Sequence, residues 1–186
     1  MQDKFIIFPT PVIKVQLNEN LNILKKFSHT LIPKNKYSNE GGLNSGSVNF
    51  NKEPLINLKD KITKIVNDNF VKDLDLKKSL MMQNMWYTIN SHKDYNHPHL
   101  HPNYIVSGVF YVNAPENSGD LILHRDNHAH FFTIHAHTTC NNLFTSSTQS
   151  ITPKNNMLIL FPSWLIHSVN PNLSHEKRIS IAFDFL

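Results

Sequence analysis

The sequence predicts a mainly β protein, with helices near its N-terminus and an antiparallel sandwich or open barrel in the rest of the chain. Short segments rich in β-branched and aromatic residues follow one another from Leu80 onward, and turn residues separate them. No amphipathic helical pattern lies between these segments, which favours antiparallel neighbours. The predicted strands span residues 81–89, 105–112, 120–123, 130–134, 157–161, 166–169 and 179–185.

Helical periodicity is confined to the first third of the chain. Residues 21–31 carry apolar side chains at helical spacing, and the pattern ends before Pro33. A second apolar stripe begins after Pro54, a residue that suits the first turn of a helix, and it predicts a helix that packs against the sheet. Residues 5–8 and 12–15 predict a broken edge strand, because prolines lie between them.

Length and composition fit one globular domain. A chain of 186 residues can bury a sizeable core, and 40% hydrophobic with 17% charged residues is typical of a folded protein. We expect a single domain over residues 1–186. Residues 1–79 would form a mixed α/β support region, and residues 80–186 would form the β core that carries the functional site.

Charge and cysteine usage exclude several classes of protein. The net charge is +4, but the lysines are spread along the chain as on solvated helix faces, which gives no strong nucleic-acid signal. Cys140 is the only cysteine, so no intramolecular disulfide and no cysteine-based metal site can form within one chain. The N-terminus lacks the apolar core of a signal peptide, and the apolar stretch 157–166 is too short for a membrane span. We therefore expect a cytoplasmic protein.

Histidines are the most informative residues. The chain has 12 of them, and neutral imidazole is a common ligand of iron, copper, zinc and nickel. His97, His99 and His101 alternate just before a predicted strand, so they could share one face of an extended segment. By itself a His-x-His pattern is a weak signal, since surface loops also carry it by chance.

Two further residues strengthen the metal interpretation. His167 follows a buried strand and a turn, and Arg178 opens the last predicted strand eleven residues later. A buried arginine is costly unless it is paired, and its forked guanidinium suits a substrate carboxylate. The alternative is an ion pair of Arg178 with Glu176 or Asp184.

The chain also resembles the 2-oxoglutarate- and Fe(II)-dependent oxygenases over nearly its whole length. The run from Phe161 to His167 is highly specific for this resemblance. The segments that carry it are Phe8-Pro9-Thr10-Pro11, Ser38-Asn39 with Gly41-Gly42, Met85-Trp86, His99-Leu100-His101-Pro102, Ser107-Gly108-Val109-Phe110-Tyr111-Val112, Pro115, Ser118-Gly119, Leu160-Phe161-Pro162-Ser163-Trp164-Leu165 with His167, and Arg178-Ile179-Ser180-Ile181-Ala182-Phe183.

The resemblance implies a double-stranded β-helix, a jelly-roll or cupin-like barrel whose mouth holds the metal. It implies an oxidoreductase that uses Fe(II), 2-oxoglutarate and O2, hydroxylates a substrate, and releases succinate and CO2. By this analogy His99, His101 and His167 bind the metal, and Arg178 binds the far carboxylate of 2-oxoglutarate. Its substrate would be an unidentified small molecule or side chain, and a homodimer through exposed sheet edges is left open.

One position departs from the pattern of the wider superfamily, whose first motif is His-x-Asp or His-x-Glu. Here the third residue of the motif is His101. Either three histidines bind the metal, which we favour, or a carboxylate such as Asp126 or Asp120 completes the usual set of two histidines and one carboxylate. The same departure leaves open a non-catalytic barrel.

The remaining candidates have more than one interpretation. Tyr87, Asn90, Asn96 and Tyr111 are candidate cosubstrate-pocket residues, and each is equally explained as a core or turn residue. The His-rich segment 124–137 is a polar insertion, a substrate lid or a second metal patch. A cupin-type metalloprotein is the alternative enzyme class, although the residues after His101 lack the glutamate that its first motif requires.

Overall fold

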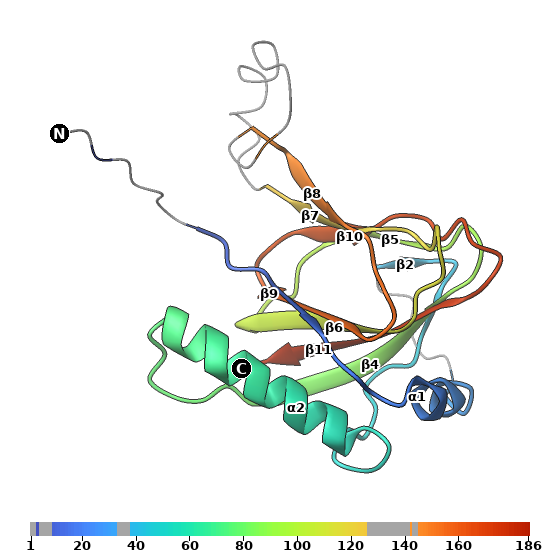
Figure 1. The fold of residues 1–186 in the computed structure, drawn as a ribbon, viewed down its shortest axis with the longest axis horizontal. Helices are drawn as coiled ribbons and strands as arrows, with labels where there is room; N and C mark the ends of the chain where they lie inside the picture. The colour runs from blue at the N-terminus through green and yellow to red at the C-terminus, as the bar shows by residue number, and fades with distance from the viewer. Residues whose placement is uncertain (1–2, 4–8, 33–37, 126–141, 143–144) are drawn as a thin grey trace.

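The structure is a computed structural model, and it describes residues 3, 9–32, 38–125, 142 and 145–186. Two antiparallel sheets face each other within this part of the chain (Figure 1). One sheet has the order β1-β9-β6-β11-β4-β3, and the other has the order β2-β5-β10-β7-β8. The strands are β1 (Ile13–Gln16), β2 (Asn39–Glu40), β3 (Leu43–Asn44), β4 (Met82–Asn90), β5 (Tyr95–His99), β6 (Val106–Asn113), β7 (Leu121–His124), β8 (Thr148–Ile151), β9 (Met157–Pro162), β10 (His167–Val169) and β11 (Arg178–Phe185).

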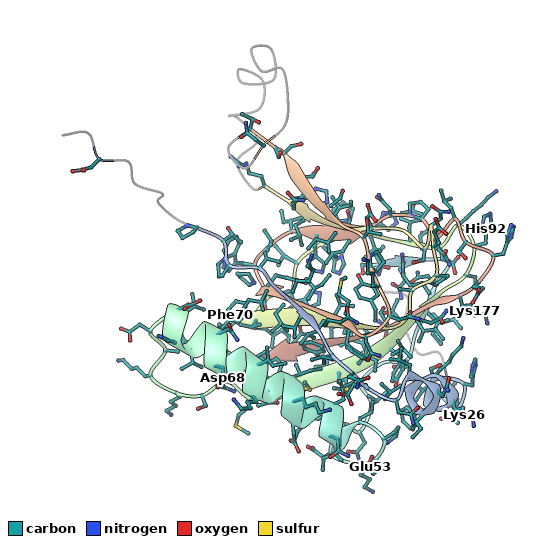
Figure 2. The ribbon with its side chains drawn as sticks, in the orientation of Figure 1. Lys26, Glu53, Asp68, Phe70, His92 and Lys177 are labelled. Atoms are coloured by element: carbon teal, nitrogen blue, oxygen red, sulfur yellow. The ribbon has the colours of Figure 1, made fainter. Side chains whose placement is uncertain are left out.

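The helices pack on the outer face of the six-stranded sheet (Figure 1). Helix α1 (Leu21–Ser28) begins at Asn20, whose side chain accepts a hydrogen bond from the backbone of Ile23. Helix α2 (Ile56–Val66) continues into a π-helical turn, η1 (Asn67–Val71). Figure 2 shows the side chains that fill the space between the two sheets, and it labels Phe70 near the end of this helical segment. The second amphipathic segment therefore packs against the sheet, as the sequence predicted.

The largest core lies between these helices and the sheet. Its fully buried members each contribute about 1.5–3 kcal/mol relative to an exposed side chain. They include Leu55, Leu58, Ile62, Val66, Phe70, Met85, Phe110, Leu158, Leu160, Ile181, Phe183 and Phe185. A smaller apolar cluster lies between the two sheets and contains Tyr111, Leu121, Leu123, Met157, Ile159, Phe161 and Leu165. The rest of the space between the sheets is available for a polar site.

Alternation along β4 and β11 divides the core from the site. The odd-numbered residues of β11, such as Ile179 and Phe183, belong to the core beneath the helices. The even-numbered residues, from Arg178 to Asp184, line a cavity between the sheets. Strand β4 pairs with β11 in antiparallel register, with Arg178 opposite Asn90, and it follows the same rule.

The mainly β class and the antiparallel topology are confirmed. Strand β1 is an edge strand, as predicted, and it pairs with β9 alone. Strands β5 and β8 were missed because polar residues dominate both and Pro98 lies inside β5. The predicted strand 130–134 and segment 5–8 lie outside the described residues. No described helix is both long and apolar enough to span a membrane.

Candidate metal centre and its pocket

Three histidines converge where β5 and β10 meet. His99 ends β5 and is paired in register with His167, the first residue of β10. His101 follows β5 by two residues, and its backbone N–H donates to the carbonyl of Ser163 at 2.9 Å. One donor atom from each histidine lies within 4.8 Å of the other two. This is the only group of three or more metal-donor side chains in the described part of the chain.

The hydrogen bonds of the three rings select the donor nitrogen. Nδ1 of His99 lies 2.7 Å from the carbonyl oxygen of His97, and Nδ1 of His167 lies 2.9 Å from that of Leu165. Nδ1 of His101 lies 2.6 Å from Oδ1 of Asp184. A carbonyl or carboxylate oxygen can only accept, so each Nδ1 carries the proton and each Nε2 keeps its lone pair. These hydrogen bonds orient the rings and leave the three Nε2 atoms as the nitrogens that could bind a metal, although Nε2 of His99 also lies 3.3 Å from Oγ of Ser38.

Burial keeps two of these rings neutral. Burial lowers the pKa of His99, and the neighbouring His101 lowers it further. Burial also lowers the pKa of His167 to about 3, assisted by repulsion from His99. A metal ligand must be deprotonated, so neither ring has to lose a proton near neutral pH before it binds.

These shifts predict a pH dependence of the metal-free protein's stability. Below about pH 6.5 the unfolded chain protonates His167, whereas the folded chain does so only near pH 3. The unfolded state therefore binds more protons in this window, and the free energy of unfolding should fall with decreasing pH by up to about 1.4 kcal/mol per pH unit for each such histidine. Urea unfolding in the presence of a chelator, between pH 5 and 8, measures this slope. A His167→Gln variant that keeps the full slope would contradict the assignment.

The histidines open into one cavity of about 570 Å³ between the sheets. Its lining includes His99, His101, His167, Arg178, Tyr111, Asp184 and the asparagines at positions 39, 44, 84, 90 and 96. This volume lies within the range of small-molecule sites, and it is large enough to hold a cosubstrate and part of a substrate.

Arg178 is buried at the start of β11, and only part of its guanidinium is satisfied. Nη1 donates to the carbonyl of Ser118, and it lies 3.3 Å from the carbonyl oxygens of Gly119 and Asn170. Nη2 is buried and has no hydrogen-bond partner within the described residues. Gly119 permits this close approach, because a Cβ there would lie 2.9 Å from Nη1, and its φ of +90° favours glycine. Burial lowers the pKa of Arg178.

Asn90 faces Arg178 across the β4–β11 ladder, and it is also unsatisfied. Both of its side-chain polar atoms are buried without a partner among the described residues. Buried polar groups are normally hydrogen-bonded, so the unpaired atoms of Asn90 and Arg178 are available to bind a polar ligand. The structure brings Asn90 to the cavity as the sequence predicted.

Tyr111 and Asn96 also line the cavity. Burial raises the pKa of Tyr111 to about 12, so its hydroxyl stays protonated and can donate a hydrogen bond at neutral pH. The side chain of Asn96 donates to Asn39, whose own Nδ2 is buried without a partner in the described structure. These asparagines extend the polar lining away from Arg178.

The assignment of Tyr87 to the pocket is wrong. Its ring belongs to the core beneath the helices, and its hydroxyl donates to the carbonyl of Leu24 in α1 at 3.2 Å. Tyr87 and Asn90 are three positions apart on one strand, so they face opposite sides of the sheet. Trp86 and Thr88, which share the parity of Asn90, line the cavity instead.

The structure tests some of the alternatives to His101 as third metal ligand and to a carboxylate-binding role of Arg178. Asp126 and most of the segment 124–137 lie outside the described residues. Asp120 is not a member of the histidine group. His97 is exposed and lies beside Glu40, with 3.5 Å between Nε2 and Oε2. Within the described part of the chain, Arg178 forms no ion pair with Glu176 or Asp184. Asp184 pairs with His101 instead, and Nη1 of Arg178 donates to the carbonyl of Ser118.

Sequence reasoning missed the role of Asp184. Apart from Arg178 at its start, Asp184 is the only charged residue of β11, and it lies on the same face of the strand as Arg178. That combination predicts a charge facing the same cavity as Arg178, and it could have been used. The serines that accompany it, Ser107 and Ser163, gave no comparable signal.

The chain belongs to the family described as "Putative 2OG-Fe(II) oxygenase", whose sequence model matches residues 84–184. The matched segment contains the three histidines, Arg178 and the strands that hold them. The protein is thus a 2-oxoglutarate- and Fe(II)-dependent oxygenase by family, as the resemblance implied. A search of curated protein sequences finds no match.

Solved structures show the same fold. A Pseudomonas putida prolyl-4-hydroxylase is 13% identical, with 94% of this chain and 91% of that chain covered and a TM-score of 0.64. The viral collagen prolyl hydroxylase of Paramecium bursaria Chlorella virus-1, in its 2-oxoglutarate complex, is 16% identical, with 94% of each chain covered and a TM-score of 0.62. HygX of Streptomyces hygroscopicus, with nickel, 2-oxoglutarate and hygromycin B bound, is 8% identical, with 95% and 82% covered and a TM-score of 0.63. The expected double-stranded β-helix is confirmed.

Proposed function

We propose that this oxygenase binds Fe(II) through Nε2 of His99, His101 and His167, and 2-oxoglutarate through Arg178. The observation that supports it best is the placement of the three histidines and Arg178 in one cavity, with Nη2 of Arg178 left without a hydrogen-bond partner among the described residues. Three nitrogen donors leave room at a metal for a chelating cosubstrate and for O2, as in the facial sites of non-haem iron oxygenases.

The residues fit the cosubstrate as well as the metal. A carboxylate beside Arg178 would accept a hydrogen bond from the unpaired Nη2, and the side-chain amide of Asn90 would give it a second donor. Tyr111 offers a third, since its hydroxyl remains protonated. The carbonyl contacts of Nη1 fix the guanidinium in place before any ligand binds, which lowers the entropic cost of binding.

When bound, Fe(II) and 2-oxoglutarate would supply the oxidation characteristic of the family, in which O2 is the oxidant, one oxygen atom hydroxylates the substrate, and the other enters the succinate that is released with CO2. The chain's own contribution is to bind, to orient and to exclude water. The apolar cluster of Phe161, Leu121 and Tyr111 closes one side of the cavity. His99 and His167 stay neutral and hold their Nε2 atoms toward the site.

The substrate is a small molecule or a side chain that enters the remainder of the cavity. Support comes from the similar structures, whose names include prolyl hydroxylases and an enzyme with hygromycin B bound. Besides the histidines, Arg178 and the apolar cluster, the cavity lining includes neutral asparagines, serines and Trp86.

Anaerobic titration of the Fe(II)-loaded protein with 2-oxoglutarate tests the proposal. A chelated 2-oxo acid gives a weak visible charge-transfer band, and we expect this band to grow to saturation at one equivalent of cosubstrate per iron. A control with succinate, which lacks the 2-oxo group, should give no band. If iron binds and no band develops with 2-oxoglutarate, the proposal fails.

A further inference from the structure

The buried carboxylate of Asp184 contacts one of the three histidines at Nδ1, the ring nitrogen that is not offered to the metal. Oδ1 of Asp184 lies 2.6 Å from Nδ1 of His101, and it accepts a hydrogen bond from Oγ of Ser107 at 2.7 Å. The side chain of Asp184 is 4% exposed. Among the described residues, His101 is the only basic side chain within ion-pair distance of it. Burying a carboxylate is costly unless it is paired, and the contact with His101 supplies that pairing.

We propose that Asp184 supplies, through His101, the negative charge that a site of three neutral histidines lacks. Two histidines and one carboxylate reduce the charge of an Fe(II) site from +2 to +1. Three neutral imidazoles leave the charge at +2, and Asp184, bonded to the far nitrogen of one of them, returns the total to +1. Asp184 is therefore a positioning residue that acts through His101, and the inference rests on the metal site of the proposed function.

The contacts distinguish His101 from the other two ligands. His99 and His167 donate from Nδ1 to neutral backbone carbonyls, whereas His101 donates to a carboxylate over the shortest of the three distances. A carboxylate partner fixes the orientation of a ligating histidine and makes it a more basic ligand. His101 occupies the position where the wider superfamily has a carboxylate ligand. The negative charge of Asp184 therefore acts at that same position.

The carboxylate is itself held by a short chain of buried hydroxyls. Oγ of Ser107 lies 2.7 Å from Oγ of Ser163, and the backbone carbonyl of Ser163 accepts from the N–H of His101 at 2.9 Å. Ser107 and Ser163 are both fully buried. The ring and the backbone of His101 are therefore fixed by one connected network from β6, β11 and the turn after β9.

The variant Asp184→Asn tests the proposal, because asparagine keeps the shape and an acceptor oxygen but removes the charge. Anaerobic competition with a chromogenic chelator gives the Fe(II) affinity, which we expect to fall about 10- to 100-fold. The Fe(III)/Fe(II) midpoint potential should rise, since loss of negative charge disfavours Fe(III). The matched variant Ser107→Ala removes a hydrogen bond and keeps the charge, so its potential should stay close to that of the unaltered protein.

Unchanged affinity and potential in Asp184→Asn would overturn the proposal, as would an equal rise of the potential in Ser107→Ala. A second measurement needs no variant. In the Zn(II)-loaded protein, NMR of the ring N–H protons should show one of the three ligand histidines shifted clearly downfield of the other two. Three similar shifts would refute the role of Asp184.

None of these three measurements uses 2-oxoglutarate, so a failure of cosubstrate binding leaves all of them interpretable. If the unaltered protein bound neither Fe(II) nor Zn(II), the metal site would be refuted and the role of Asp184 with it. If metal binds and the potential and the ring protons show no effect of the carboxylate, only the role of Asp184 is refuted.

Discussion

Replacing His167 with alanine should weaken Fe(II) binding by more than about 100-fold. This exceeds the 10- to 100-fold loss that typically follows removal of a residue that only hydrogen-bonds to a metal ligand. His167 has the most constrained ring of the three, because it is buried, is packed against Phe161 at 4.6 Å between ring centroids, and lies in register with His99. Removing it leaves two donors from one short segment. Iron content after anaerobic loading and desalting measures the effect.

His97→Ala is the matched control for this variant. It removes an imidazole from the same segment of the chain, but His97 is exposed and points toward Glu40 rather than toward the other histidines. The backbone carbonyl of His97, which accepts from His99, is retained in the variant. We expect wild-type iron content for His97→Ala. Equal iron content in the His167 and His97 variants would disprove the assigned ligand set.

Replacing Arg178 with methionine should weaken 2-oxoglutarate binding by about 30-fold or more and leave Fe(II) binding intact. Loss of one partner of a buried charge pair costs about 2–5 kcal/mol, and each 1.4 kcal/mol is a factor of ten. Methionine retains apolar volume but cannot donate to a carboxylate. The anaerobic charge-transfer titration gives the affinity for 2-oxoglutarate, and the chelator competition gives the affinity for Fe(II).

Tyr87→Phe is the control for the Arg178 variant. Tyr87 lies on β4, the strand that pairs with Arg178 through Asn90, but its side chain faces the helices. Loss of its hydrogen bond to Leu24 should lower the free energy of unfolding by about 0.5–1.5 kcal/mol. The affinity for 2-oxoglutarate should not change. An Arg178 variant with unaltered 2-oxoglutarate affinity would exclude the guanidinium as the cosubstrate ligand.

Much of the site could be predicted from the sequence because its residues lie at ends of strongly patterned strands. His167 follows the buried strand β9, and Arg178 opens β11, so strand prediction alone placed both near the rim of a sheet. The alternation of His99 and His101 predicts that they share one face, but their convergence with His167 required the resemblance, because β5 is polar and contains Pro98.

Two features of the site could not be read from the sequence pattern as it was used: which side of the sheet Tyr87 faces, and which residues distant in sequence are in contact. Tyr87 was assigned to the pocket with Asn90 although the two differ by an odd number of positions on one strand, and alternation alone would have separated them. The contact between Asp184 and His101 joins residues 83 positions apart. Local patterns cannot indicate such a pair without the pairing of β6 with β11, which brings Ser107 opposite Asp184.

The proposed site and the folding of this protein both depend on the register of strand β11. Its even positions carry Arg178 and Asp184 into the cavity, while its odd positions fill the core beneath the helices. A slip of one residue against β4 and β6 would exchange the two sets, so it would place charged groups in the core and phenylalanines in the cavity. A misaligned chain therefore cannot persist as a folded but inactive form, and a single-residue deletion in the middle of β11 should abolish folding along with metal binding.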